Sequence, residues 1–274
     1  MATLTGDELR VLIHDLQAAW DDYGDAEVLH QPAARRNRPF TGEDAQRVGV
    51  VHGWVRHLHE TGKAAVLLLN NGLVNAALPL VRQMFELALT SVWVMQSEDQ
   101  HGVRAVVLEH SRNRAAFARE ARLAQSPTFQ QSADEIVDTD SGHIPGTFDS
   151  VQRFREVCLD LTPAGHDAYV IYRVLSTYSH PSVSVSDLYF DAPATPAERL
   201  PARRLLATAA IPADTLLYFV AVTLVWGARA YVYTSQDKMH RSLLRSAARV
   251  LLVTSEIKLS EHYRRRHAKR RKDG

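Results

Sequence analysis

Hydrophobic residues recur along most of the chain at the three- and four-residue spacing of amphipathic helices. The two-residue alternation of strands and the turn sequences of hairpins are scarce. A first helix is predicted to begin at a capping box made by Thr5 and Glu8. One face of that helix is apolar and consists of Leu9, Leu12, Ile13, Leu16 and Trp20. The pattern therefore predicts an all-α helical bundle.

The next segment is the most apolar part of the N-terminal half. A second helix is expected to begin at Thr41, with Asp44 as its capping partner, and to end at Gly62. From 63 to 96 the chain is almost continuously apolar, and Pro79 is expected to kink or break it. Polar side chains inside such a segment need partners in a bundle. They are Asn70, Asn71, Asn75, Arg82 and Glu86.

The remaining pattern continues the helical reading. Further helices are predicted over residues 99–123, 147–161, 166–180, 213–233 and 237–257, with a loop over 125–146. Pro181 halts the helix that precedes it, and Thr195 to Glu198 reads as another helix start. Residues 1–257 are interpreted as one helical domain.

Charge is divided unevenly along the chain. The formal net charge of +1 combines −5 on residues 1–257 with +6 on residues 258–274. The basic segment is predicted to be a flexible, solvated tail, and contact with nucleic-acid phosphate or an anionic membrane surface is the alternative. Its candidate nucleic-acid-binding residues are Arg264, Arg265, Arg266, Lys269, Arg270, Arg271 and Lys272.

The cysteine content, the N-terminal segment and the apolar runs of the chain indicate its cellular location. Cys158 is the only cysteine, so an internal disulfide is excluded, and the charged N-terminus does not resemble an export signal. The apolar run over 216–228 has 13 residues, fewer than the roughly 20 of a membrane-spanning helix. We therefore expect a cytoplasmic protein without a membrane span.

Several common catalytic motifs are missing from the sequence. It contains no Gly-rich phosphate loop, no Gly-x-Ser-x-Gly motif and no His-Glu-x-x-His motif. His57 and His59 would point about 200° apart on a helix, so they do not face one metal ion. We therefore expect neither a metal nor a cofactor.

Arg173 and His180 are the most informative candidates. Seven residues give about 700° of helical rotation, which places both on one line, with Ser176 and Thr177 beside them and Tyr178 near the end. A guanidinium can bridge phosphate oxygens, and an imidazole can move a proton near neutral pH. Seven helical residues also rise about 10.5 Å. One phosphate reaches both groups only if Arg173 leans along the helix, the last turn distorts, or a second subunit contributes.

An Arg followed by four to six residues and a His near a helix end resembles the HEPN superfamily of all-α nucleotide-binding proteins. More narrowly, Leu80 to Leu89 and Tyr172 to Ser182 resemble an uncharacterised helical family with an Arg-x-x-Phe-Glu helix upstream of a Tyr-x-x-Leu-Ser-x-x-x-His segment. The resemblance covers about residues 63–181 and leaves the terminal helices outside it. It implies a metal-independent endoribonuclease, usually a homodimer, acting as a toxin or antiphage effector with an antitoxin or defence-system partner.

The resemblance also implies roles for individual residues. His180 would act as general base or acid and Arg173 would stabilise phosphate charge during attack by a ribose 2′-hydroxyl. Other readings stay open: Arg173 as a salt-bridge partner of Glu86, or a non-catalytic RNA-binding, sensor or scaffold module. Many active HEPN nucleases have a polar residue after the arginine, where this chain has Val174. Arg82 and Glu86, four residues apart, are predicted to form a buried structural pair, with Glu86 as a possible orienting group.

Overall fold

The computed structural model describes residues 4–24, 40–135, 147, 149–191, 202–203, 207–233 and 240–273. Within these residues the regular structure is helical apart from four two-residue strands. Antiparallel pairing joins β1 (Leu161–Thr162) to β4 (Lys258–Leu259) and β2 (Phe190–Asp191) to β3 (Ala202–Arg203). The predicted all-α fold class is confirmed.

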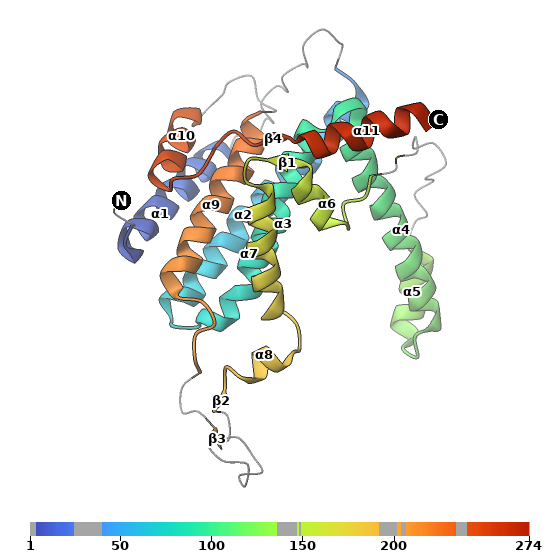
Figure 1. Cartoon of the computed structure of the whole chain (residues 1–274). Helices are drawn as coiled ribbons and strands as arrows, with labels where there is room; N and C mark the ends of the chain where they lie inside the picture. The colour runs from blue at the N-terminus through green and yellow to red at the C-terminus, as the bar shows by residue number, and fades with distance from the viewer. Residues whose placement is uncertain are drawn as a thin grey trace.

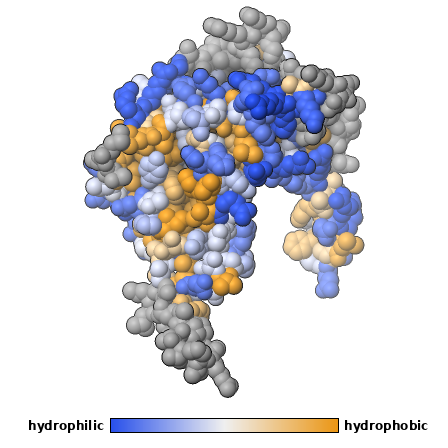
Figure 2. Space-filling view, viewed as in Figure 1, coloured by the Kyte–Doolittle hydropathy of each residue, from blue (hydrophilic) through white to orange (hydrophobic). Residues whose placement is uncertain are grey.

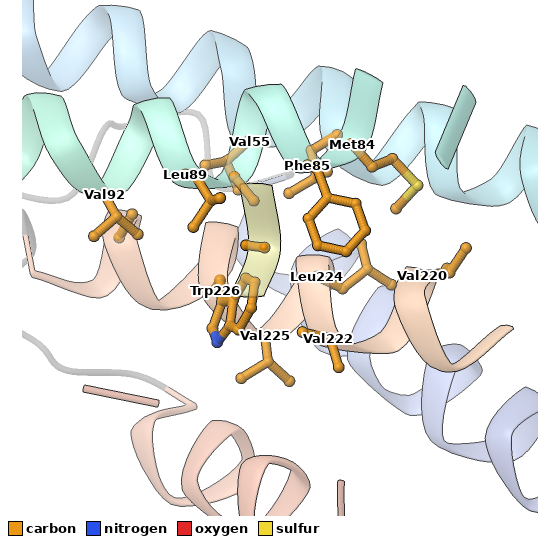
Figure 3. Packing of buried hydrophobic residues seen from close by; sticks show 14 of the residues in the cluster. Val55, Met84, Phe85, Leu89, Val92, Val220, Val222, Leu224, Val225 and Trp226 are labelled. Carbon is orange, nitrogen blue, oxygen red and sulfur yellow. The ribbon is translucent and has the colours of Figure 1, made fainter. Parts of the chain in front are cut away.

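Four long helices form the central bundle (Figure 1). They are α1 (Gly6–Gly24), α2 (Gly42–Asn70), α3 (Val74–Gln96) and α9 (Ala213–Val232). Figure 3 shows buried side chains of α2, α3 and α9 packed between the helices. Phe85 of α3 is set edge-on against Trp226 of α9, with 6.3 Å between ring centroids. Burying large apolar side chains contributes about 1.5–3 kcal/mol each, so this contact region supplies most of the stabilisation.

Shorter helices surround the bundle. An arm projects from it, made of α4 (His101–Leu123) and α5 (Pro127–Glu135), which follow the 3-10 turn η1 (Glu98–Gln100) (Figure 1). Figure 2 shows apolar surface on this arm, where Phe117, Leu123 and Phe129 are exposed. The other peripheral helices are α6 (Phe154–Leu159), α7 (Gly165–Thr177), α8 (Val183–Ser186), α10 (Arg241–Val250) and α11 (Glu261–Asp273).

Both N-terminal capping boxes are confirmed. The Thr5 backbone nitrogen donates to Glu8 at 2.8 Å, and Thr41 and Asp44 make the same reciprocal pair. The predicted end at Gly62 is wrong, because α2 continues to Asn70. Gly62 is buried there, and an added Cβ would lie 3.1 Å from the Met84 methyl, so close packing against α3 compensates for its poor helix propensity.

The break between α2 and α3 lies later than the sequence pattern indicates. It falls at Gly72, whose φ of +73° is accessible to glycine at little cost. Pro79 lies inside α3 without ending it; as the sixth residue it removes only one backbone hydrogen bond near the helix start. The interrupting polar residues find partners: Arg10 donates to Asn70 at 2.8 Å, and the Asn75 amide bonds the backbone of Thr208 and Ala210.

Helix boundaries in the C-terminal half also differ from the predicted ones. The segment predicted as a loop contains α5, and the helix predicted over 147–161 is limited to the six residues of α6. Within the described residues 240–257, the final predicted helix is limited to α10, which ends before Leu252, a residue with φ +58°. The helix start predicted at Thr195 lies outside the described residues.

Helix α9 is the only described helix with the length and composition of a membrane span. Its 20 residues have a mean hydropathy of 1.5, and 78% of the apolar window is buried inside the protein. It is therefore longer than the 13-residue run seen in the sequence. A helix buried at the centre of a bundle can have the same length and apolar composition as a membrane-spanning helix. This finding therefore neither supports nor excludes a membrane span.

Candidate functional site

An open pocket of about 460 Å³ lies between α6 and α7. It is lined by Gln152, Arg153, Phe154, Arg155, Glu156, Tyr169, Tyr172, Arg173, Ser176 and His180. The volume lies within the range of about 300–1,000 Å³ that small-molecule sites occupy. We refer to it as the α6–α7 pocket.

Helical spacing brings the α7 side chains to this pocket. Tyr169, Arg173 and Ser176 follow one another at intervals of three or four residues, so they share one face of α7. Gly165 lets α7 approach α6 closely, because a Cβ there would lie 1.9 Å from the carbonyl oxygen of Cys158. The walls of the pocket are thus held at a fixed separation by backbone packing.

Arg173 and His180, the predicted pair, line this one pocket and are both exposed. The helix does not run through to His180 as expected: α7 ends at Thr177, and the Ser179 backbone nitrogen then donates to the Ser176 carbonyl at 3.2 Å. This tighter turn begins before Pro181, which cannot continue a helix. A distorted last turn was one of the three arrangements the spacing required.

The supporting residues divide into two groups. Ser176 lines the pocket, and its hydroxyl oxygen is buried with no hydrogen-bond partner among the described residues. The Thr177 hydroxyl instead donates to the Arg173 carbonyl at 3.1 Å, and Tyr178 packs against the hydrophobic core. Of these three residues, Ser176 is the one that lines the pocket.

Arg82 and Glu86 form the predicted pair, with 3.1 Å between Nη2 and Oε1. The pair is half-buried rather than buried, because the side chains are 22% and 36% exposed. Arg82 also donates to the Tyr172 hydroxyl at 2.8 Å and lies over the Tyr172 ring. Glu86 thus pairs with Arg82 and not with Arg173. The pair is not part of the pocket lining, but Arg82 positions Tyr172, which does line the pocket.

Sequence reasoning missed two cationic residues of the pocket. Arg153 and Arg155 flank Phe154 at the start of α6 and are exposed. Arg155 lies 3.4 Å from Glu156, whereas Arg153 and Arg173 have no ion pair with any described residue. The sequence signal for these two residues was the Arg-Phe-Arg triplet. This triplet is common on amphipathic helices and does not show which other helix it faces. The pocket holds three guanidinium groups against one carboxylate, so it favours an anionic ligand.

The basic C-terminal segment is organised differently from the prediction. The expectation of a flexible tail is wrong for residues 258–269, which form β4 and most of α11. Arg266 pairs with Asp149 and Asp160, and both carboxylates are fully buried. Trp93 also donates to Asp160 at 3.0 Å, and His267 contacts Asp149 at 3.2 Å. Arg266 therefore anchors α11 to the body of the protein and is not available to nucleic acid.

The other basic residues of α11 lie on its surface. Arg264 and Arg265 are exposed and lie 3.5 and 3.7 Å from Glu261 in the same helix. Lys269 is exposed as well. Arg270, Arg271 and Lys272 belong to α11, but their side chains lie outside the described part of the chain.

Titration behaviour follows from this packing. Burial alone would raise the pKa of Asp149, but hydrogen bonds from His267 and Arg266 and the charge of Arg266 outweigh it and lower that pKa. Burial, with the nearby charge of Glu86, raises the pKa of Cys158 to about 12, so this thiol is not a nucleophile. Among the described residues, no group of three His, Cys, Asp or Glu side chains is arranged to hold a metal ion.

Fold and pocket together define an all-α bundle that carries a cationic, aromatic-walled pocket beside its central helices. Residues 48–195, more than half of the chain, match a protein family of unknown function, DUF5677, and the chain belongs to this family. The match includes the α6–α7 pocket and ends before α9, α10 and α11. No curated protein and no solved structure matched the chain.

Proposed function

We propose that this protein is a metal-independent endoribonuclease of HEPN type that acts at the α6–α7 pocket. The observation that carries the proposal is that Arg173, Ser176 and His180 line one open pocket together with additional guanidinium groups. A cationic pocket attracts the phosphate backbone, and the rings of Tyr169 and Tyr172 offer surfaces on which bases can stack.

The reaction needs no group beyond the chain and a ribose. The 2′-oxygen attacks the adjacent phosphorus, the bond from phosphorus to the 5′-oxygen breaks, and a 2′,3′-cyclic phosphate and a 5′-hydroxyl result. His180 moves one of the two protons involved, either from the 2′-hydroxyl or to the 5′-oxygen. Arg173 stabilises the charge that develops on the phosphate oxygens.

A homodimer would complete this chemistry. One imidazole per chain serves one proton transfer, so the matching histidine of a second copy is the group proposed for the other. The same resemblance carries the proposals of an antitoxin or defence-system partner and of a role as toxin or antiphage effector. A cytoplasmic location, as expected from the sequence, would expose such an enzyme to RNA.

The decisive variant is His180→Ala, assayed on single-stranded RNA in the presence of a chelator. General acid–base catalysis contributes about 10²–10⁴-fold, so cleavage should fall by that factor while folding is unchanged. His166→Ala is the matched control, because His166 is exposed in the first turn of the same helix and does not line the pocket. Cleavage that persists in His180→Ala, or that requires a metal ion, contradicts the mechanism.

A non-catalytic RNA-binding module is the second candidate. Val174, which is 45% exposed, favours it, since the position that follows Arg173 carries no polar side chain to assist the chemistry. Such a module would bind RNA with an affinity that falls as salt rises, and would release no cyclic phosphate.

A further inference from the structure

The arm formed by α4 and α5 is joined to the α6–α7 pocket. Gln152, which lines the pocket, donates a hydrogen bond to the carboxylate of Glu109, a buried residue of α4. Figure 1 shows α4 running away from the bundle toward α5, and Figure 2 shows open space between this arm and the bundle. The part of α4 that follows Glu109, residues 110–123, therefore extends from the pocket into solvent.

One stripe along α4 passes from the buried part of the helix to the exposed part. Residues at intervals of three or four share one face of a helix. The residues of this stripe are Ala105, Glu109, Arg112, Ala116, Arg119 and Leu123. The first two are buried, whereas Arg112 and Arg119 are exposed and Leu123 is 79% exposed. The outer part of the α4 stripe thus continues the face on which Glu109 meets the pocket.

Arg112 and Arg119 are the charged residues of this outer part. Neither has an ion pair with any residue that the structure describes. They are seven residues apart, which is a rise of about 10.5 Å along the helix. The nearest exposed carboxylate of α4, Glu120, is turned by about 100° from Arg119. Two cations on one line without internal partners favour a ligand whose negative charges also repeat along a line, as phosphates do in a nucleic-acid strand.

We propose that the α4 stripe extends the RNA site of the α6–α7 pocket, so that a single strand held in the pocket continues along the arm with its phosphates on Arg112 and Arg119. This extension rests on the proposed function, because the pocket must itself hold RNA. From Glu109 to Arg119 the helix rises about 15 Å, which corresponds to between four and five steps of about 3.4 Å in a stacked strand. The substrate is thus a single strand several nucleotides longer than the segment in the pocket.

The test compares the binding of a trinucleotide with that of a 16-nucleotide single strand, at the upper end of known site sizes. Both are 2′-O-methyl RNA, which lacks the attacking hydroxyl and is not cleaved. Fluorescence anisotropy is measured over a range of salt concentrations, and wild type should bind the long strand more tightly. Arg112→Ala/Arg119→Ala should weaken the long strand about tenfold or more and reduce its salt slope by about 1.4, with little change for the trinucleotide.

Two control variants separate phosphate contact from other effects. Arg245→Ala/Arg249→Ala removes the same charge from the exposed surface of α10, which lies on the other side of the bundle from the arm in Figure 1. It should leave binding of the long strand nearly unchanged. Glu120→Ala alters the residue next to Arg119 and should bind the long strand no more weakly than wild type, because it removes a negative charge. Weaker binding in this variant would mean that the arm had been disrupted.

The possible outcomes distinguish the arm from the pocket. Equal affinity of wild type for the two strands, or equal losses in the arm and α10 variants, overturns the role of the arm. The pocket would still be supported if the trinucleotide is weakened by Arg153→Ala/Arg173→Ala. Unchanged binding of the long strand in the arm variant would also overturn it and point to an acidic protein surface as the partner of these arginines. Wild type that binds neither strand contradicts the proposed function as well.

Discussion

Arginine occurs in two opposite settings in this protein. In the α6–α7 pocket Arg153 and Arg173 are exposed and have no carboxylate partner among the described residues. In α11 Arg266 is enclosed by Asp149 and Asp160, which are fully buried. In the first setting the positive charge remains available to an anionic ligand. In the second setting the charge is neutralised by carboxylates of the protein itself.

The difference changes the functional reading of the sequence. The C-terminal run of basic residues is the stronger signal by count, yet its Arg266 fastens a helix to the core. The two isolated arginines of the pocket are weak signals by count, yet they are the ones available to a phosphate. A cationic side chain points to nucleic acid only after its possible internal partners are known.

The largest expected effect is on the free energy of unfolding and comes from removing the charge of Arg266. Arg266→Ala leaves two buried carboxylates uncompensated, and breaking a buried pair in this way costs about 3–5 kcal/mol. Chemical denaturation followed by circular dichroism measures this loss. Arg265→Ala is the control, because its exposed contact with Glu261 is worth about 0–1 kcal/mol. Equal losses in the two variants would show that α11 is not anchored through Arg266.

A smaller effect is expected from pH. Because the folded-state pKa of Asp149 is lowered, its contribution to stability is present above the unfolded pKa of about 3.9 and is lost as pH falls through the folded value. Wild type should therefore lose stability toward acid more steeply than Asp149→Asn, which lacks this titration. Unfolding free energies measured between pH 6 and pH 3 on both proteins provide the check. Parallel curves would mean that Asp149 is not ionised in the folded cluster.

Local signals predicted much of the fold from the sequence. The capping boxes at Thr5 and Thr41 depend on residues three positions apart, so both were predicted correctly. The continuation of α2 through Gly62 depends on Met84, which comes from another helix. No local pattern contains that information.

The same distinction applies to the sites. Arg173, Ser176 and His180 share one helix and its terminal turn, so their spacing indicated a common face. Arg153 and Arg155 reach the pocket from a separate helix, and the partners of Arg266 lie 106 and 117 residues away in the sequence. The stacking of His59 on Trp20 was also missed, since this contact joins two helices.

We propose that the unpartnered arginines of the α6–α7 pocket, and not the basic helix α11, bind RNA. Fluorescence anisotropy of a short single-stranded RNA tests it, with Arg153→Ala/Arg173→Ala compared with Arg264→Ala/Arg265→Ala over a range of salt concentrations. The pocket variant should lose affinity by about tenfold or more and reduce the salt slope by about 1.4, while the α11 variant changes little. The opposite ranking, with affinity lost only in the α11 variant, would show that α11 binds RNA and the α6–α7 pocket does not.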